Sequence, residues 1–197
     1  IPAHKVTAIV GESGCGKSML CKTIMKLLPK SAKIEGGKII ANGVDITDYS
    51  DKDMRKLRGK LFSMIFQDPM DSLNGRAKVG YIVAEGLYAP GRHYTEEERR
   101  EKVNQALSDV GLLPEFASRF PHEFSGGQRQ RIGIARALVL DPQFIVADEP
   151  ISALDMSIRD QVLNLLAKLQ KERGLTYLFV AHDLSVVRFI CDRIAVI

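Results

Sequence analysis

Long hydrophobic runs are missing from this sequence: no apolar stretch approaches the ~18 residues that a membrane-spanning helix needs. Any association with a membrane is therefore expected to come through a partner. Cysteine is scarce as well, and Cys15, Cys21 and Cys191 form an odd set without the spacing of a zinc site or a metal cluster. Three such cysteines, in a sequence without a recognisable signal peptide, are typical of a protein of the reducing cytosol.

A dense stripe of one charge is also missing. The formal net charge is +4, and the basic residues are scattered, with acidic residues interspersed later in the chain. A nucleic-acid footprint requires clustered Lys and Arg, so we interpret this pattern as a solvated surface and expect no nucleic-acid partner. With 45% hydrophobic and 26% charged residues, the composition argues against disorder and against a fibrous fold. The length of 197 residues favours one domain with a sub-lobe over two independent domains.

Periodicity and turn signals alternate between strands and helices along the chain. Apolar runs predict strands at residues 5–10, 61–69, 144–150 and 176–183, and the Asn42-Gly43 turn predicts a hairpin within residues 36–46. Helical spacing covers residues 19–28, 95–110 and 161–173. The alternation predicts an α/β core with a mostly helical insertion from about residue 73 to 138. Because the chain starts at Ile1 and stops within an expected strand at Ile197, we expect the natural protein to extend beyond both ends.

Residues 11–18, GESGCGKS, fit the phosphate-binding pattern GxxxxGK[ST] and lie between a predicted strand and a predicted helix. Gly11 and Gly16 would let the backbone wrap around a β-phosphate, and Lys17 would reach the β and γ oxygens. The Ser18 hydroxyl would coordinate Mg²⁺. We therefore expect a nucleoside triphosphate site with a magnesium ion.

Polar residues follow three other predicted strands. Asp148 is placed to hold magnesium directly or through water, and Glu149 to take a proton from an attacking water. His182 could contact the γ-phosphate or polarise that water, and Gln67 could touch the metal. Each has a plainer interpretation: a solvated turn for the Asp-Glu pair, a structural role for a lone histidine, and a surface position for the glutamine. Asp155, in SALD, has an ordinary helix-cap interpretation.

A second glycine loop, EFSGGQRQR at residues 123–131, opens another predicted helix, where free backbone amides can hold an anion. One phosphate loop should suffice for one nucleotide, so the residues alone leave the purpose of the second loop unexplained.

Six motifs in this order, GESGCGKS, FQDP, FSGGQ, IVADEP, SALD and AHD, resemble those of the ATP-binding subunits of ABC transporters over nearly the whole chain. SGGQ is the most specific of them. The resemblance implies an α/β fold with a RecA-like P-loop NTPase core (residues 1–72 and 139–197), whose sheet is mostly parallel, and an antiparallel β portion near the N-terminus. It also implies an inserted helical subdomain (residues 73–138), giving one ABC ATPase domain in total.

The resemblance assigns roles to individual residues, with ATP and Mg²⁺ as the ligands. It implies catalytic roles for Glu149, His182, Lys17 and Gln67, and magnesium contacts from Ser18, Gln67 and Asp148. The implied nucleotide contacts are Gly11, Glu12, Ser13, Gly14, Cys15, Gly16, Lys17, Ser18, Gln67, Ser125, Gly126, Gly127, Gln128, Asp148 and Asp155. The signature, residues 124–128, departs from the family pattern by starting with Phe124 where leucine is usual.

In this family two ATPase lobes dimerise head to tail, so the resemblance implies that the signature of one lobe closes over ATP held by the other. Phe124 or Ser125 should then approach Cys15 of the other chain. Finer resemblance to oligopeptide, dipeptide and nickel importers implies two membrane-spanning permeases and, indirectly, an extracytoplasmic solute-binding protein. It also implies a peripheral location at the cytoplasmic face of the membrane. The sequence leaves open the solute and whether the second ATPase is a copy or a paralogue.

The sequence lacks features typical of two other functions. A soluble ABC ATPase acting on nucleic acid or ribosomes usually carries a long coiled coil or a second fused cassette, and neither is evident in this sequence. A phosphate-loop GTPase would contain a guanine-reading NKxD motif, which the sequence lacks, and a small-molecule kinase would need a substrate lid.

Overall fold

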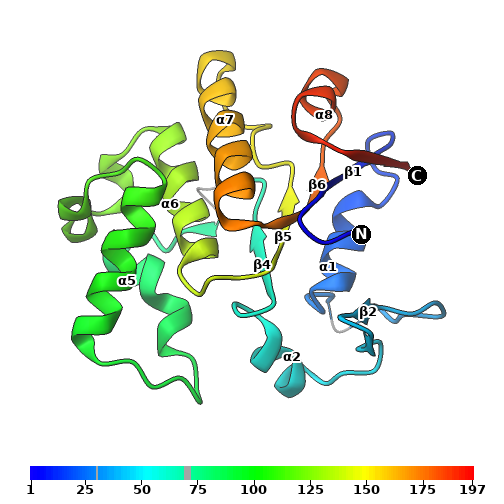
Figure 1. The fold of residues 1–197 in the computed structure, drawn as a ribbon, viewed down its shortest axis with the longest axis horizontal. Coiled ribbons are helices and arrows are strands. Elements are labelled where there is room, and N and C mark those ends of the chain that lie inside the picture. The colour runs from blue at the N-terminus through cyan, green and yellow to red at the C-terminus, as the bar shows by residue number, and fades with distance from the viewer. Residues whose placement is uncertain (30, 69–71) are drawn as a thin grey trace.

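Figure 1 shows the fold as a computed structural model, which describes residues 1–29, 31–68 and 72–197. In these parts of the chain the main sheet has five parallel strands in the order β4-β5-β6-β1-β7, and β2 pairs with β3 in a separate antiparallel hairpin. The strands are β1 (Val6–Val10), β2 (Ile40–Ala41), β3 (Val44–Asp45), β4 (Phe62–Ile65), β5 (Phe144–Asp148), β6 (Thr176–Val180) and β7 (Arg193–Val196).

Helices connect the parallel strands, as crossover connections require. The α-helices are α1 (Lys17–Ile24), α2 (Asp51–Leu57), α4 (Val79–Ala84), α5 (Glu96–Asp109), α6 (Gly126–Leu138), α7 (Met156–Arg173) and α8 (Leu184–Ile190). Short 3₁₀ turns are η1 (Glu85–Tyr88), η2 (Pro114–Ser118) and η3 (Pro121–Glu123). None of the described helices is both long and apolar enough to cross a membrane. The α/β fold class predicted from the sequence is confirmed.

Both faces of the main sheet are covered, because successive side chains of its central strands point to opposite sides. All five residues of β6 are buried. Tyr177 and Phe179 join the core cluster that includes α6, α7 and α8, whereas Leu178 and Val180 join a second cluster with α1 and α2. The sheet is therefore a rigid middle layer, and its carboxyl edge is a stable platform for a site.

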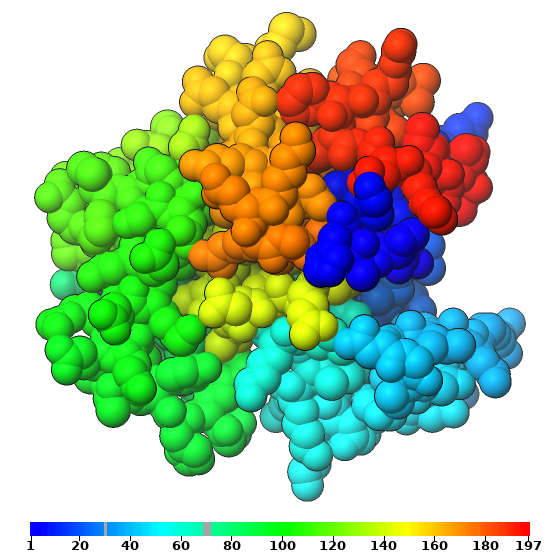
Figure 2. All heavy atoms as spheres, viewed as in Figure 1, coloured from blue at the N-terminus to red at the C-terminus, as the bar shows by residue number. Residues whose placement is uncertain are grey.

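The segment between β4 and β5 is mostly helical, as the sequence predicts. Helices α4, α5 and α6 pack against one another, and Figure 2 shows their atoms, in green, gathered on one side of the molecule. Helix α5 begins at a capping box: Thr95 accepts a hydrogen bond from the Glu98 amide, and the Glu98 side chain accepts one from the Thr95 amide. The helix ends at Asp109, and Gly111, two residues further, has a left-handed φ of 72°.

The predicted helix over residues 19–28 is shorter than expected. Helix α1 ends at Ile24, and Lys26 has a left-handed φ of 52°. The Arg58 guanidinium donates to the carbonyl oxygens of Met25 and Lys26 at 3.1 and 2.7 Å. A tertiary contact therefore caps this helix, and the apolar periodicity of residues 25–28 does not report it.

Helix α7 is longer than the predicted range of 161–173, because it starts at Met156. Its first turn is largely exposed, so it lacks the apolar periodicity on which the prediction depends. The helix ends at Arg173, as predicted, and the next residue, Gly174, has a left-handed φ of 60°. The predicted hairpin is also confirmed: Asn42 and Gly43 both have positive φ, at 48° and 79°, as a two-residue turn between antiparallel strands requires.

Candidate nucleotide site

The glycine loop after β1 surrounds a buried lysine. Gly16 is the N-cap of α1 and has a φ of 100°, a conformation that a side chain would strain. Lys17 is 6% exposed, and its Nζ donates to the carbonyl oxygens of Gly11 and Glu12 at 3.0 and 2.7 Å. These two carbonyls hold the ammonium group inside the loop, next to the free amides at the start of α1. Such a loop is suited to a polyanion.

A hydroxyl and a carboxylate lie beside this lysine. Ser18 Oγ donates to Asp148 Oδ1 at 2.9 Å, although 130 residues separate them in the sequence. Burial raises the pKa of Asp148 above its usual range and the nearby Glu149 adds to the effect, while the bond from Ser18 opposes it. A cation beside Asp148 would stabilise the ionised form of this buried carboxylate.

The two oxygens of this pair suit Mg²⁺, which prefers hard oxygen ligands and often keeps several waters and phosphate oxygens in its coordination shell. No group of three or more His, Cys, Asp or Glu that could hold a metal occurs in residues 1–29, 31–68 and 72–197. Ser18 and Asp148 could thus supply protein ligands, and a bound phosphate would have to complete the shell.

The Glu149 carboxylate is contacted from two neighbouring strands. Its Oε2 lies 3.4 Å from Gln67 Nε2, after β4, and 3.5 Å from His182 Nδ1, after β6. The Glu149 backbone has a φ of 45°, and its amide donates to the Val180 carbonyl oxygen at 3.2 Å. The carboxyl ends of β4, β5 and β6 therefore bring three of the predicted catalytic side chains together. Lys17 and Ser18 lie beyond the end of β1, the next strand of the sheet.

The second glycine loop opens α6. Ser125 is the N-cap, and it exchanges hydrogen bonds with Gln128: the Ser125 hydroxyl accepts from the Gln128 amide at 3.4 Å, and Gln128 Oε1 accepts from the Ser125 amide at 3.0 Å. Gly127 faces α7, where a Cβ on it would lie 2.4 Å from Ile158 Cγ2. Only glycine fits this close approach.

Of Phe124 and Ser125, the two residues expected to approach a partner chain, Phe124 is buried within its own chain. Phe124 is 4% exposed and packs edge-on against Phe116, with ring centroids 5.4 Å apart. The aromatic ring replaces the usual leucine as an anchor for the loop inside the helical region. Ser125 and Gly126 are exposed, so they can meet another molecule.

The remaining predicted contacts lie on the surface of loops. Glu12, Ser13, Gly14 and Cys15 are exposed in the phosphate loop. Asp155 is exposed at the N-cap of α7, but its side chain makes no capping hydrogen bond. Asp155 therefore occupies the position that the helix-cap interpretation expects, but its side chain does not cap the helix. Of the FQDP motif, Pro69 lies outside the described residues, as do Met70 and Asp71 after it.

Sequence reasoning missed Arg159, which donates to the carbonyl oxygens of Leu154 and Ser152 in the loop after Glu149. One signal was available. Arg159 follows the N-cap Asp155 by four residues, and a cation near the N-terminus of a helix opposes the helix dipole. An arginine at such a place is better explained by a contact outside its own helix.

Known proteins resemble this chain in sequence over nearly all of its length. It is 57% identical to the oligopeptide transport ATP-binding protein OppF of Streptococcus pyogenes serotype M1 over 190 residues, which is 96% of this chain and 61% of that protein. It is 53% identical to the dipeptide transport ATP-binding protein DppF of Lactococcus lactis subsp. cremoris over 188 residues, 95% of this chain and 59% of that protein. The chain thus spans about three fifths of the length of these relatives.

Solved structures share the fold. The structure of cbiO1 from Clostridium perfringens, described as part of the ABC transporter complex cbiONQ, aligns with a TM-score of 0.85 and 34% identity, covering 100% of this chain and 74% of that one. The dimeric cassette MJ0796 bound to ADP and Pi aligns with a TM-score of 0.85 and 32% identity, covering 100% and 82%. The family model described as ABC transporter matches residues 1–152. The chain therefore belongs to the ABC transporter family.

Proposed function

We propose that the protein containing this chain hydrolyses Mg-ATP and uses the energy to power import of a small solute through an ABC transporter. The solute class that we propose is peptides. The observation that carries the proposal is the convergence at one sheet edge of buried Lys17, the Ser18–Asp148 pair and the Glu149 carboxylate. The relatives named as oligopeptide and dipeptide transport ATP-binding proteins support the solute class. They favour transport over work on nucleic acid.

The chemistry follows from the position of each side chain. Lys17 exchanges its bonds to two backbone carbonyls for the β and γ oxygens of ATP. Ser18 and Asp148 would hold Mg²⁺, which would neutralise phosphate charge. Glu149 accepts the proton of a water whose oxygen attacks the γ-phosphorus, as the bond from that phosphorus to the bridging oxygen of ADP breaks. Gln67 and His182 orient the Glu149 carboxylate through Oε2.

The second glycine loop serves another chain's nucleotide in this proposal. The exposed Ser125 and Gly126, at the N-terminus of α6, would approach the γ-phosphate of ATP held by the phosphate loop of a second ATPase subunit, identical or homologous. Two chains would then enclose two ATP molecules. We propose the division of the chain into a nucleotide-binding core (residues 1–72 and 139–197) and a helical signature subdomain (residues 73–138) on the same basis.

A groove beside β4 is the surface we propose for a membrane-spanning permease. It lies between α2 and the end of α4, with Phe66 among its apolar lining residues. Among its described lining residues Lys and Arg outnumber Asp and Glu, with Lys52, Lys60 and Arg92 contributing positive charge. An occupant with acidic and apolar side chains complements it. Two permeases would hold the ATPase pair at the cytoplasmic face of the membrane and link it indirectly to an extracytoplasmic solute-binding protein.

Charge reversal tests this surface. Lys52→Glu with Lys60→Glu should abolish solute uptake while basal ATP hydrolysis stays within about twofold, because the nucleotide site is not touched. Lys168→Glu, on the exposed surface of α7, is the matched control and should leave uptake unchanged. Uptake that survives the double reversal would contradict the groove assignment.

The hydrolytic proposal is tested by Glu149→Gln in the full-length protein. Removal of the proton acceptor should lower kcat by about 10² to 10⁴, while ATP binding survives because the phosphate loop is intact. The measurement is phosphate release beside equilibrium binding of ATP. Wild-type turnover in this variant would remove Glu149 from the mechanism.

A further inference from the structure

Glu149 sits in a backbone conformation that residues other than glycine rarely adopt. Its φ of 45° costs energy and persists only where the surroundings fix it. On one side the Glu149 amide donates to the Val180 carbonyl oxygen. On the other side Ser152 donates twice to the Glu149 carbonyl oxygen, from its amide at 3.2 Å and from its hydroxyl at 3.0 Å. The direction of the Glu149 carboxylate therefore depends on where Ser152 lies.

Ser152 is itself held by Arg159, a half-buried residue near the start of α7. Arg159 Nε donates to the Leu154 carbonyl oxygen at 2.7 Å, and its Nη2 donates to the Ser152 carbonyl oxygen at 3.2 Å. The guanidinium is a planar fork, so the two bonds fix two points of the loop at once. Charge-assisted bonds of this kind are stronger than bonds between neutral groups.

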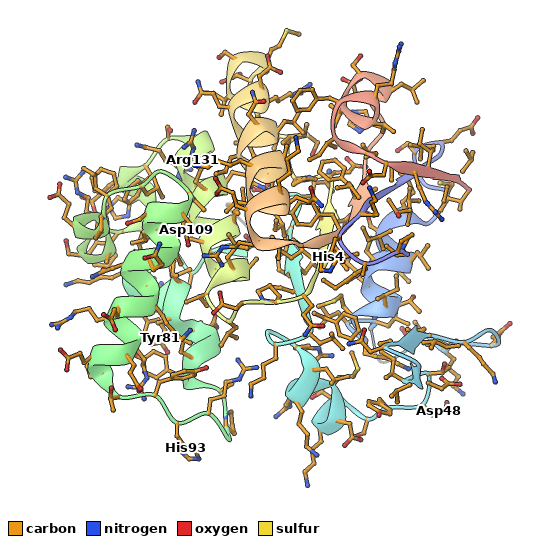
Figure 3. The ribbon with its side chains drawn as sticks, viewed as in Figure 1. His4, Asp48, Tyr81, His93, Asp109 and Arg131 are labelled. Carbon is orange, nitrogen blue, oxygen red and sulfur yellow. The ribbon has the colours of Figure 1, made fainter. Side chains whose placement is uncertain are left out.

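The helix turn that carries Arg159 is anchored against the signature. Ile158 fills the space over Gly127 on α6, and Arg131 of α6, labelled in Figure 3, donates to Gln161 Oε1 at 3.2 Å. Arg159 thus reaches the loop from a fixed base. Arg159 lines the same pocket as Glu149, Ser152 and His182, so it lies beside the loop that carries the proposed proton acceptor.

We propose that Arg159 is a positioning residue for ATP hydrolysis. It holds the Ser152 carbonyl, Ser152 holds the Glu149 carbonyl, and the Glu149 carboxylate is thereby kept in line with the attacking water. The proposal rests on the assignment of Glu149 as the proton acceptor. The proposal predicts that Arg159 affects the rate of hydrolysis and not the affinity for ATP. The bonds of Arg159 go to Leu154 and Ser152, and not to Lys17 or Ser18 of the phosphate loop.

The experiment uses the full-length protein and the variant Arg159→Met, which keeps the length of the side chain and removes the donors. A small displacement of a catalytic group can cost up to about 100-fold, so kcat should fall about 10- to 100-fold while the Kd for ATP stays within about twofold. The matched control is Arg58→Met. Arg58 is also half-buried and also donates to two backbone carbonyls, those of Met25 and Lys26 at 3.1 and 2.7 Å, and these bonds involve neither α6 nor α7. Its loss should lower Tm similarly but leave kcat within about twofold.

A second measurement tests the route through Ser152. Ser152→Ala removes one of the two bonds to Glu149, and its effect on kcat should be smaller in the Arg159→Met background than in the wild type, because both changes loosen the same loop. Additive effects would contradict the relay. If Arg159→Met does not fold, Arg159→Lys replaces it; lysine keeps the charge but lacks the fork, so kcat should be intermediate with unchanged ATP affinity.

The outcomes of these experiments separate the positioning role of Arg159 from the role of Glu149 as the proton acceptor. Wild-type kcat in Arg159→Met, or in Arg159→Lys where that variant replaces it, overturns the positioning role. An equal fall of kcat in Arg58→Met also overturns it, because the effect would then be one of general stability. Failure of the proposed base shows separately, as turnover that survives in Glu149→Gln.

Discussion

The two glycine loops of this chain both open a helix, yet they are built in opposite ways. At the start of α1 the N-cap is Gly16, which has no side chain to occupy the helix amides, and the buried Lys17 adds a positive charge. At the start of α6 the Ser125 hydroxyl accepts from the Gln128 amide, and Gly127 is pressed against Ile158. We call the first loop (residues 11–18) the cradle, because it is suited to enclose an anion, and the second (residues 125–128) the flat edge, because its own serine caps it and Gly127 packs closely on Ile158.

This difference explains why one chain would need both loops. An edge that is internally capped and carries no buried lysine is poorly suited to hold a nucleotide alone, but it can press on one that another cradle already holds. The two loops are also held in place by different elements. The cradle is fixed by the sheet edge, whereas the flat edge is fixed by α7, the helix whose Arg159 holds the loop of Glu149. The following predictions test this contrast.

The largest expected difference between the loops is in ATP binding. Lys17→Ala should weaken ATP binding by about 100-fold or more, because a buried charge that pairs with phosphate is lost. Ser125→Ala should leave the ATP affinity of an isolated subunit within about twofold, since no part of the cradle changes. Equilibrium binding of ATP to both variants measures the contrast. Equal losses would mean that both loops serve one nucleotide within one chain.

Stability should distinguish the two glycines of the signature. Gly127→Ala places a Cβ against Ile158 and should lower the free energy of unfolding by about 1–3 kcal/mol. Gly126→Ala is the matched control, because the nearest atom to its Cβ, Leu154 Cδ2, is 3.9 Å away. Chemical denaturation measures both. Ile158→Ala should recover much of the loss from Gly127→Ala, and the absence of any recovery would contradict the packing described for this joint.

The reactivity of the Cys15 thiol should show that the cradle is open to solvent. Cys15 is exposed in the phosphate loop, with Sγ 3.7 Å from Lys17 Nζ, whereas burial raises the pKa of Cys21 and of Cys191 to about 12. Among these three residues we expect iodoacetamide at pH 8 to label Cys15 first, to block ATP binding, and to be slowed by Mg-ATP. Peptide mass mapping identifies the labelled residue. Modified Cys15 with unchanged ATP affinity would show that the thiol lies away from the nucleotide.

The smallest expected effect concerns the folding stability that is lost by burying Asp148 at the proposed metal site. Because burial raises the pKa of Asp148, the folded protein binds this proton more tightly than the unfolded chain, so stability declines as pH rises through the raised pKa. At neutral pH the carboxylate opposes folding. Asp148→Asn should therefore raise Tm by about 1–3 °C without nucleotide, after allowance for solvent screening, and should weaken stabilisation by Mg-ATP. A lower Tm without nucleotide would contradict this account of Asp148.

Much of this site was predictable because its residues follow strands. Gly11, Asp148 and His182 come after short apolar runs, and parallel strands bring their carboxyl ends to one edge. The order of the strands, β4-β5-β6-β1-β7, was not predicted, and it is what brings Gln67 and His182 to the same oxygen of Glu149. Nor can a sequence pattern report a contact such as Gly127 with Ile158, which depends on how two helices cross.

Element ends were harder to predict than element types. The end of α1 depends on Arg58, 33 residues further along the chain from Met25, and the first turn of α7 has little apolar periodicity. Phe124 illustrates a related limit. In a glycine-rich loop an aromatic residue could point either way, and only the position of Phe116 shows that it points inward.

The central claim, that the flat edge of one chain closes over the cradle of another, is tested most directly by a disulfide between Cys15 and Ser125→Cys. The full-length protein carries Glu149→Gln as well, so that ATP persists, and mild oxidant is added with Mg-ATP. Cys15 of one chain and residue 125 of its partner should then have Cα atoms within about 7 Å, the range that a disulfide spans. The account predicts an ATP-dependent dimer band on a non-reducing gel that disappears in Cys15→Ser. An internal disulfide that leaves the mass unchanged, or a dimer band that persists without Cys15, would contradict it.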